Sequence, residues 1–214
     1  MDLGLKDKKA LVTGGSHGIG LAIVQALREE GCKVGSISRR EGCDVLRPAD
    51  INKALKEFSN IDILVNNVGG GGRWGDENPL ATETTVWREI YEKNAMVAVR
   101  FTINSIPYML KRGWGRVITI ASIYGREGGG RPWFNMAKAA EISFMKTMAM
   151  HYKGSGVTFN SVAPGLIAIA NTTNEIEGGT PEEVASVVVF LASEKANLVN
   201  GACIAVDGGE GRSF

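Results

Sequence analysis

Thr13-Gly14-Gly15-Ser16-His17-Gly18-Ile19-Gly20 lies near the start of the chain, between two segments of different hydrophobic period. Residues 9–13 form an apolar run that predicts a buried strand, and residues 18–30 predict a helix with one apolar face. Glycine at this junction permits a tight turn, and it lets backbone N–H groups approach a pyrophosphate at the positive end of the helix. The stretch therefore predicts a dinucleotide-binding strand–turn–helix unit, the alternative being a glycine-rich turn that binds nothing.

The rest of the chain repeats this alternation of short apolar runs and helix-length segments. Such alternation predicts an α/β protein, a Rossmann-type doubly wound parallel sheet with helices on both faces. At 214 residues, one NAD(P)-binding domain over residues 1–214 is expected. Further strands are predicted at 33–38, 43–46, 61–66, 116–122, 157–163 and 203–206, and further helices at 49–58, 84–111, 134–152 and 181–191.

Prolines and capping residues refine the helix boundaries. Pro48 and Pro181 suit first helical turns, and Thr180 with Glu183 has the spacing of a capping box. Pro107 predicts a kink near the far end of the helix at 84–111.

Composition excludes several classes of function. A formal net charge of +1 provides no electrostatic basis for binding nucleic acid or an anionic membrane. Cys32, Cys43 and Cys203 are too few and too widely spaced for a disulfide framework or a zinc site, so no metal is expected. The charged residues after Met1 contain no targeting run, and no window has the roughly 18 apolar residues of a membrane helix. We therefore expect a cytoplasmic protein.

The motifs, taken together, resemble the short-chain dehydrogenase/reductases. The glycine turn has the spacing Thr-Gly-(x)3-Gly-x-Gly, and later segments match that family in the same order over essentially the whole chain. They are Asp44-Val45, Asn66-Asn67-Val68-Gly69, Asn94, Ser122, Lys138, Pro164-Gly165 and Val206-Asp207-Gly208-Gly209. The resemblance implies that the cofactor contacts are Gly14, Ser16, His17, Gly18, Ile19, Gly20, Asp44, Val45, Asn67, Gly69, Lys138, Pro164, Gly165 and Ile167, together with the end of the second strand.

The end of the second strand indicates which cofactor is used. Such a strand usually ends in an acidic residue when the cofactor is NAD, and arginine instead meets the 2′-phosphate of NADP. Here Ser38 stands where the acid would, Arg39 and Arg40 follow, and no carboxylate is expected to oppose a phosphate. NADP is therefore predicted over NAD, the alternative being that both arginines belong to a solvated turn.

Residues 120–139 contain the catalytic positions that the resemblance implies. In this family a tyrosine hydroxyl exchanges a proton with the substrate while the cofactor exchanges a hydride. By position, Ser122 polarises the carbonyl, Lys138 binds the nicotinamide ribose and Asn94 supports a proton relay. The implied activity is the interconversion of a carbonyl and a secondary alcohol, but Phe134 occupies the tyrosine position and has no proton to give.

The missing hydroxyl leaves several interpretations open. Tyr124 could replace it, although that residue lacks the i,i−4 relation to Lys138. The chain could carry an engineered tyrosine-to-phenylalanine change, which the retention of Ser122, Lys138 and Asn94 favours. It could instead be a natural NADP-binding sensor or scaffold that no longer catalyses. In either case poor activity is expected.

Other positions bear on the substrate and on assembly. Ile169 stands where the family usually has a threonine near the nicotinamide, and few residues remain between it and Pro181 for a substrate lid. Arginines beside tryptophans suit an anionic or sugar-like substrate, unless they are merely solvated. They lie at Arg73-Trp74, Arg126 and Arg131-Pro132-Trp133. The resemblance also implies a homotetramer or homodimer that packs through the helices at 84–111 and 134–152.

Overall fold

Six parallel strands form the central sheet of the computed structural model, which describes residues 2–71, 74–168 and 178–213. The strand order is β2-β1-β3-β4-β5-β6. This order reverses direction between β1 and β3, and in open α/β sheets ligands bind outside the carboxyl ends of the strands at that point. The strands are β1 (Lys9–Thr13), β2 (Lys33–Ile37), β3 (Ile63–Asn66), β4 (Gly115–Ile120), β5 (Val157–Pro164) and β6 (Cys203–Val206).

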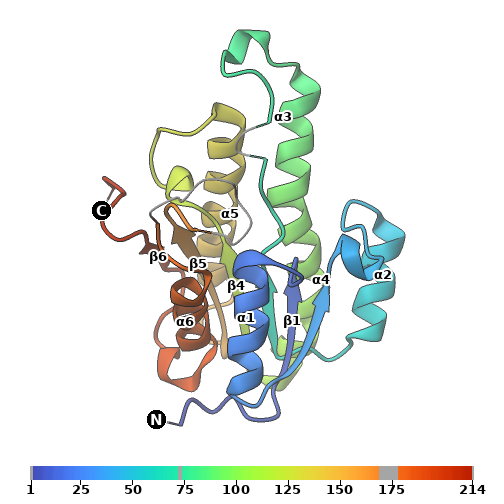
Figure 1. Cartoon of the computed structure of the whole chain (residues 1–214). Coiled ribbons are helices and arrows are strands. Elements are labelled where there is room, and N and C mark those ends of the chain that lie inside the picture. The colour runs from blue at the N-terminus through green and yellow to red at the C-terminus, as the bar shows by residue number, and fades with distance from the viewer. Residues whose placement is uncertain (1, 72–73, 169–177, 214) are drawn as a thin grey trace.

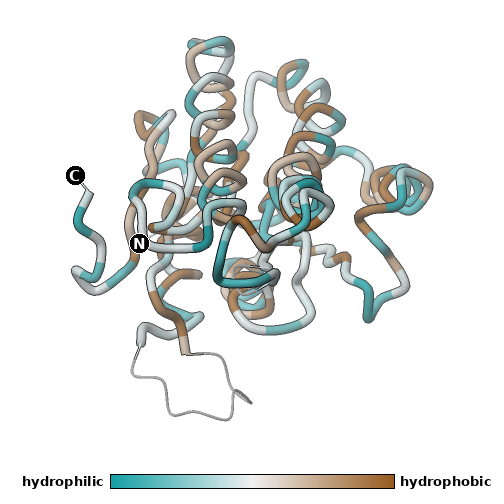
Figure 2. Tube along the Cα trace, turned by 90° about the horizontal axis from the view of Figure 1, so that it is seen from above, coloured by the Kyte–Doolittle hydropathy of each residue, from teal (hydrophilic) through white to brown (hydrophobic). Residues whose placement is uncertain are grey.

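Helices cover both faces of the sheet (Figure 1). On one face lie α1 (Gly18–Glu29) and α6 (Pro181–Ala192), which pack against each other. On the other lie α2 (Pro48–Glu57), α4 (Val97–Arg112) and α5 (Pro132–His151), while α3 (Thr84–Tyr91) extends beyond the sheet. In the view from above, the helices carry both hydrophobic and hydrophilic residues (Figure 2), as expected for helices with one buried face. The predicted doubly wound α/β fold is confirmed.

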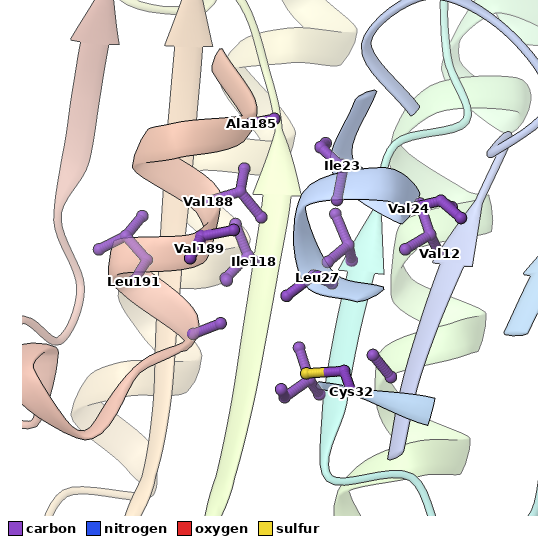
Figure 3. Close-up of a cluster of buried hydrophobic side chains, with 14 of the residues drawn as sticks. Val12, Ile23, Val24, Leu27, Cys32, Ile118, Ala185, Val188, Val189 and Leu191 are labelled. Atoms are coloured by element: carbon purple, nitrogen blue, oxygen red, sulfur yellow. The ribbon is translucent and has the colours of Figure 1, made fainter. Parts of the chain in front are cut away.

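Each sheet face has its own hydrophobic core. Ile23 and Leu27 of α1 and Val188 of α6 pack over Val12 of β1 and Ile118 of β4 (Figure 3). The residues next to these along the strands point to the opposite core, because successive side chains of a strand alternate between faces. That second core contains Leu11, Leu64, Phe101, Val117, Met145 and Phe159.

The strand predicted at 43–46 is wrong. A hydrogen-bonded turn occupies this segment: the side chain of Asp44 accepts from the Leu46 amide at 3.1 Å, and its backbone carbonyl accepts from the Arg47 amide at 2.9 Å. The carboxylate of Asp50 also accepts from the Asp44 amide at 2.9 Å. Aspartate side chains offer the backbone an alternative to a strand ladder. The apolar signal came from Val45, whose side chain is buried in the core without joining the sheet.

The long helix predicted at 84–111 contains a change of helix type. Between α3 and α4 lies one π-helical turn, η3 (Glu92–Met96), and Pro107 remains inside α4. Such turns are rare and occur often at functional sites. Short 3₁₀ turns also occur at η1 (Arg39–Glu41), η2 (Pro79–Ala81), η4 (Ile123–Gly125) and η5 (Glu194–Ala196).

The predicted helix start at Thr180 is confirmed. Its hydroxyl accepts from the Glu183 amide at 3.3 Å, and the Glu183 carboxylate accepts from the Thr180 amide at 2.7 Å. Among the described residues no helix is both long and apolar enough to cross a bilayer.

Candidate active site

The carboxyl ends of β1 and β3 are joined by the side chains of Thr13 and Asn67. The Thr13 hydroxyl oxygen accepts from the amides of Asn67 and Val68, at 2.9 and 3.0 Å. The Asn67 side-chain amide donates to the carbonyls of Thr13 and Gly14, at 2.9 and 3.2 Å. These four bonds hold the glycine turn against the loop after β3. The role of the Thr13 hydroxyl was not predicted from the sequence.

The glycine turn has the geometry of a phosphate cradle. Gly14 and Gly18 have positive φ angles of 72° and 52°, which favour glycine. A Cβ on Gly20 would stand 2.2 Å from the Gly14 carbonyl oxygen, so helix and turn touch backbone to backbone. His17 is the N-cap of α1 and its side chain makes no capping bond, which leaves N–H groups of the first turn available to an anion. The turn therefore fits the pyrophosphate of a dinucleotide.

The side chains of Ser16 and His17 lie next to each other on the turn. The Ser16 hydroxyl is 3.3 Å from Nδ1 of His17, and His17 is exposed. Ile19 is half-buried and packs against the core below. Of the six predicted turn contacts, these are the three with side chains beyond hydrogen, and only Ser16 and His17 carry hydrogen-bonding groups there.

A carboxylate lies at the end of β2, where none was expected. Glu41 of η1 accepts from the hydroxyls of Ser38 and Ser36, at 2.7 and 3.1 Å. Arg39 and Arg40 lie in the same 3₁₀ turn and are exposed. The sequence prediction rested on Ser38, Arg39 and Arg40, and the turn brings Glu41 back to the strand-end serine, three positions before it. The end of β2 therefore carries a carboxylate as well as two guanidiniums.

Asp44 and Val45 follow η1 closely. Asp44 is half-buried, and its side chain is engaged in the turn described above. The side chain of Val45 is buried among apolar residues, so a bound cofactor would meet only the backbone of this residue.

Asn94 lies in the π turn and orders the loop after β3. Its Oδ1 accepts from the Gly70 amide at 3.0 Å, and its Nδ2 donates to the carbonyls of Gly70 at 3.0 Å and Ile90 at 2.8 Å. A Cβ on the neighbouring Gly69 would stand 2.6 Å from Oδ1 of Asn94 and 3.0 Å from Nζ of Lys138. The structure thus brings Gly69, Asn94 and Lys138 together, as the order of motifs predicted. The Asn94 side chain is fully buried and occupied by these bonds.

Ser122 follows β4 and begins the 3₁₀ turn η4. Its hydroxyl oxygen accepts from the Tyr124 amide at 3.2 Å, so the hydroxyl hydrogen remains able to donate to a ligand. The turn packs tightly on α5, because a Cβ on Gly125 would stand 2.7 Å from the backbone of Lys138. The Tyr124 ring lies against the glycine-rich loop, where a Cβ on Gly130 would approach it to 3.0 Å.

Phe134 and Lys138 lie on one face of α5, one turn apart. The Lys138 ammonium is 5.8 Å from the centre of the Phe134 ring, and it donates to the carbonyl of Ile120 at 3.0 Å. Ile120 is the last residue of β4, two positions before Ser122. This bond attaches the lysine to the strand end that carries the serine. Serine, lysine and phenylalanine are therefore in one place, as the sequence predicted.

Glu141 is a further residue of the site that was not predicted from the sequence. Its carboxylate oxygens lie 2.9 and 3.3 Å from Nζ of Lys138, and its side chain is only 1% exposed. Burial raises the pKa of the Glu141 carboxyl, and the Lys138 charge opposes that rise. The sequence does contain a sign of this contact: the glutamate comes three residues after the lysine, on the same helical stripe as Ala137 and Met145.

The residues after β5 are those predicted to contact the nicotinamide end of a cofactor. Pro164 ends the strand, the Gly165 amide donates to the Val206 carbonyl at 3.1 Å, and Ile167 pairs with Gly179 in an isolated bridge. The Leu166 amide donates to the Glu210 carboxylate at 2.7 Å. Between these segments lies a hollow of about 620 Å³. Ile169, which stands where the family usually has a threonine near the nicotinamide, lies outside the described residues.

The loop arginines differ in their surroundings. Arg131 donates to the carbonyl of Gly75 and lies 3.8 Å from the Glu77 carboxylate, so it ties together the start of α5 and the loop at 74–78. Arg126 is half-buried, and Arg73 lies outside the described residues. The ammonium of Lys93 lies 4.1 Å from the centre of the Trp74 ring. The predicted pairing of Arg73 with Trp74 therefore stays a prediction, because it involves a residue outside the described ranges.

The fold and the crevice define a class, that of the oxidoreductases with a Rossmann-type dinucleotide-binding sheet. A family model described as enoyl-(acyl carrier protein) reductase matches residues 38–210. The chain belongs to the short-chain dehydrogenase/reductase family, whose members are NAD(P)-dependent dehydrogenases and reductases.

Individual relatives match over nearly the whole chain. The 3-oxoacyl-[acyl-carrier-protein] reductase of Vibrio cholerae is 34% identical over 243 aligned positions, covering 97% of this chain and 98% of the relative. The enzyme of the same name from Aquifex aeolicus is also 34% identical, covering 98% and 99%. Among solved structures, the aldohexose dehydrogenase of Thermoplasma acidophilum superposes with a TM-score of 0.85 at 28% identity, covering 98% of this chain and 96% of that one.

Proposed function

We propose that this chain binds NADP(H) and interconverts a small carbonyl compound and the corresponding secondary alcohol, slowly because position 134 is phenylalanine. The observation that carries the proposal is the bond from Lys138 to the Ile120 carbonyl, which holds the lysine beside Ser122. The proposed substrate site lies above these two residues, at the carboxyl ends of β4 and β5.

The proposed roles follow from hydrogen-bonding capacity. The Ser122 oxygen already accepts a backbone N–H, so its hydrogen is free to polarise a substrate carbonyl. Lys138 would hold the nicotinamide ribose, and Asn94 orders the loop beside it. When bound, NADPH supplies the hydride. The chain would then leave proton delivery to water, and losing a positioned general acid typically costs about 10²–10⁴ in rate.

The cofactor contacts that we propose are the glycine turn, the segment around Asn67 and Gly69, and the residues at 164–167. Arg39 and Arg40 favour NADP over NAD, because two exposed guanidiniums can pair with the 2′-phosphate. The Glu41 carboxylate nearby works against that preference. We expect Arg39→Asp to weaken NADPH binding by at least about tenfold, a loss of one charge-assisted contact. Unchanged affinity for NADPH would count against the NADP assignment.

The substrate is proposed only as a chemical class. Two of the similar proteins are a 3-oxoacyl-[acyl-carrier-protein] reductase and an aldohexose dehydrogenase. Both names describe carbonyl–alcohol chemistry, and for this chain we propose a small anionic or sugar-like carbonyl compound or alcohol. We further propose a cytoplasmic homotetramer or homodimer that packs through α4 and α5, where Ile103, Met136 and Met150 are exposed.

A second candidate is a non-catalytic NADP-binding sensor or scaffold, which Phe134 favours. The two functions are separated by Phe134→Tyr, with NADPH oxidation followed against a panel of ketones that includes a 3-oxoacyl thioester, and NADP+ reduction followed with an aldose. We expect a rise in kcat/KM of about a hundredfold or more with at least one substrate. Tyr124→Phe is the matched control, and it should not lower the activity of the parent chain. No gain with any substrate would support the binding protein.

A further inference from the structure

The Lys138 ammonium has most of its hydrogen-bonding capacity committed within the protein. An ammonium group has three N–H donors. One is directed to the Ile120 carbonyl at 3.0 Å, and at least one more is directed to Glu141, whose nearer oxygen is at 2.9 Å. At most one N–H therefore remains for a ribose hydroxyl.

The charge of Lys138 is also compensated inside the protein. The side chains of Lys138 and Glu141 are 5% and 1% exposed, so water screens the pair very little. Among the described residues, only Lys138 forms a hydrogen bond or ion pair with the Glu141 carboxylate. The two opposite charges thus form a nearly neutral unit.

Other ionisable groups on the elements around α5 do not take part in this unit. β5 carries none, and Arg116 of β4 is held at the other end of that strand by the carbonyls of Ser193 and Gly156. The remaining groups, none of which contacts the Glu141 carboxylate, are Arg88, Glu89 and Tyr91 of α3, Glu92 and Lys93 of η3, and Tyr124 of η4.

We propose that Glu141 is a positioning residue that holds Lys138 and supplies its counter-charge, so that little of the lysine charge acts on the side chain at position 134. An uncompensated lysine would lower the pKa of a phenol at position 134, because an opposite charge within about 4–6 Å favours the phenolate. In this chain Glu141 offsets that effect. Glu141 therefore sets how much of the Lys138 charge acts at position 134.

The role of Glu141 rests on the proposed function, but it can be tested without a substrate. The phenol of Phe134→Tyr is titrated by tyrosinate absorbance between pH 6 and 10.5, with the parent chain as the blank that cancels the other tyrosines. We expect a phenol pKa near the ordinary value of about 10. In Phe134→Tyr with Glu141→Gln, the phenol pKa should fall by about one to two units. The matched control is Phe134→Tyr with Glu89→Gln, which removes an exposed carboxylate from the neighbouring helix and should leave the pKa unchanged.

The outcomes separate the two proposals. A phenol pKa already near 8 in Phe134→Tyr, or one that Glu141→Gln does not lower, overturns the role of Glu141 whatever the activity. A lowered pKa in the double variant without activity on any substrate supports the role of Glu141 and counts against the reductase. If Glu141→Gln does not fold, Glu141→Met, which also removes the charge, is judged by the same titration. With an active substrate, the pH profile of alcohol oxidation should move to lower pH by the same one to two units.

Discussion

Replacing Lys138 by methionine tests the buried pair through protein stability. The change keeps an unbranched side chain of similar length and removes the charge, which leaves the Glu141 carboxylate buried at 1% exposure without its cation. Breaking a buried ion pair by removing one partner typically costs about 3–5 kcal/mol. That is a large share of the roughly 5–15 kcal/mol by which domains are stable, so the variant should be clearly destabilised.

The loss should depend on pH in a definite direction. Burial already raises the pKa of Glu141 above its ordinary value of 4.5, and removing Lys138 removes the interaction that opposes this rise. Above pH 4.5 the unfolded chain releases the proton of this carboxyl while the folded variant retains it. The free energy of unfolding therefore falls as pH rises from 4.5 to the folded pKa, with a slope of up to about 1.4 kcal/mol per pH unit. The variant should be least impaired near pH 5.

Urea unfolding at pH 5.5 and pH 8.0 measures this effect. The control is Lys138→Met combined with Glu141→Gln, which removes both charges and should recover most of the stability at pH 8.0 while losing the extra pH dependence. Equal losses at the two pH values, or a double variant as unstable as the single one, would refute the reasoning, because the buried carboxylate would then not be the source of the cost.

Three further predictions concern the crevice and the core. Thr13→Val removes the acceptor for two amides and should cost about 1–3 kcal/mol in urea unfolding. Thr158→Val, at a buried hydroxyl with no hydrogen-bond partner among the described residues, should be nearly neutral. Gly20→Ala places a Cβ 2.2 Å from a backbone oxygen and should weaken NADPH binding, measured by fluorescence, by at least about tenfold; the control Gly128→Ala has open space. Burial raises the pKa of Cys32 to about 11, so iodoacetamide at pH 8 should leave this cysteine unmodified in the folded protein, as judged by mass spectrometry.

The prediction of the fold succeeded where the signal was local and repeated. The apolar runs at β1, β3, β4 and β5 are each bounded by polar or glycine-rich residues, and the parallel order follows from their alternation with helices. It failed at residues 43–46, because two aspartate side chains bond to the backbone there and form a turn. Hydrophobicity alone does not distinguish a buried strand residue from a buried residue in a turn.

The sequence likewise predicted part of the candidate site and missed other parts. The motif order placed Ser122, Asn94 and Lys138 at neighbouring positions, and the structure brings them together. Glu41 was overlooked because its approach to Ser38 depends on the 3₁₀ turn that follows β2. The contact between α5 and η4 at Gly125 was likewise not foreseen, since it requires knowing how closely two backbones approach.

The sequence by itself determined the class of fold, the family and the absence of a hydroxyl at position 134, because each of these depends on residue identity and spacing along the chain. Only the tertiary structure decided where the charge of Lys138 goes. Glu141 is three residues away in any helix, and on an exposed face such a pair would be weakly coupled and screened by water. Packing of α5 against β5 and η4 removes that water, and burial makes the pair a determinant of the chemistry of the site.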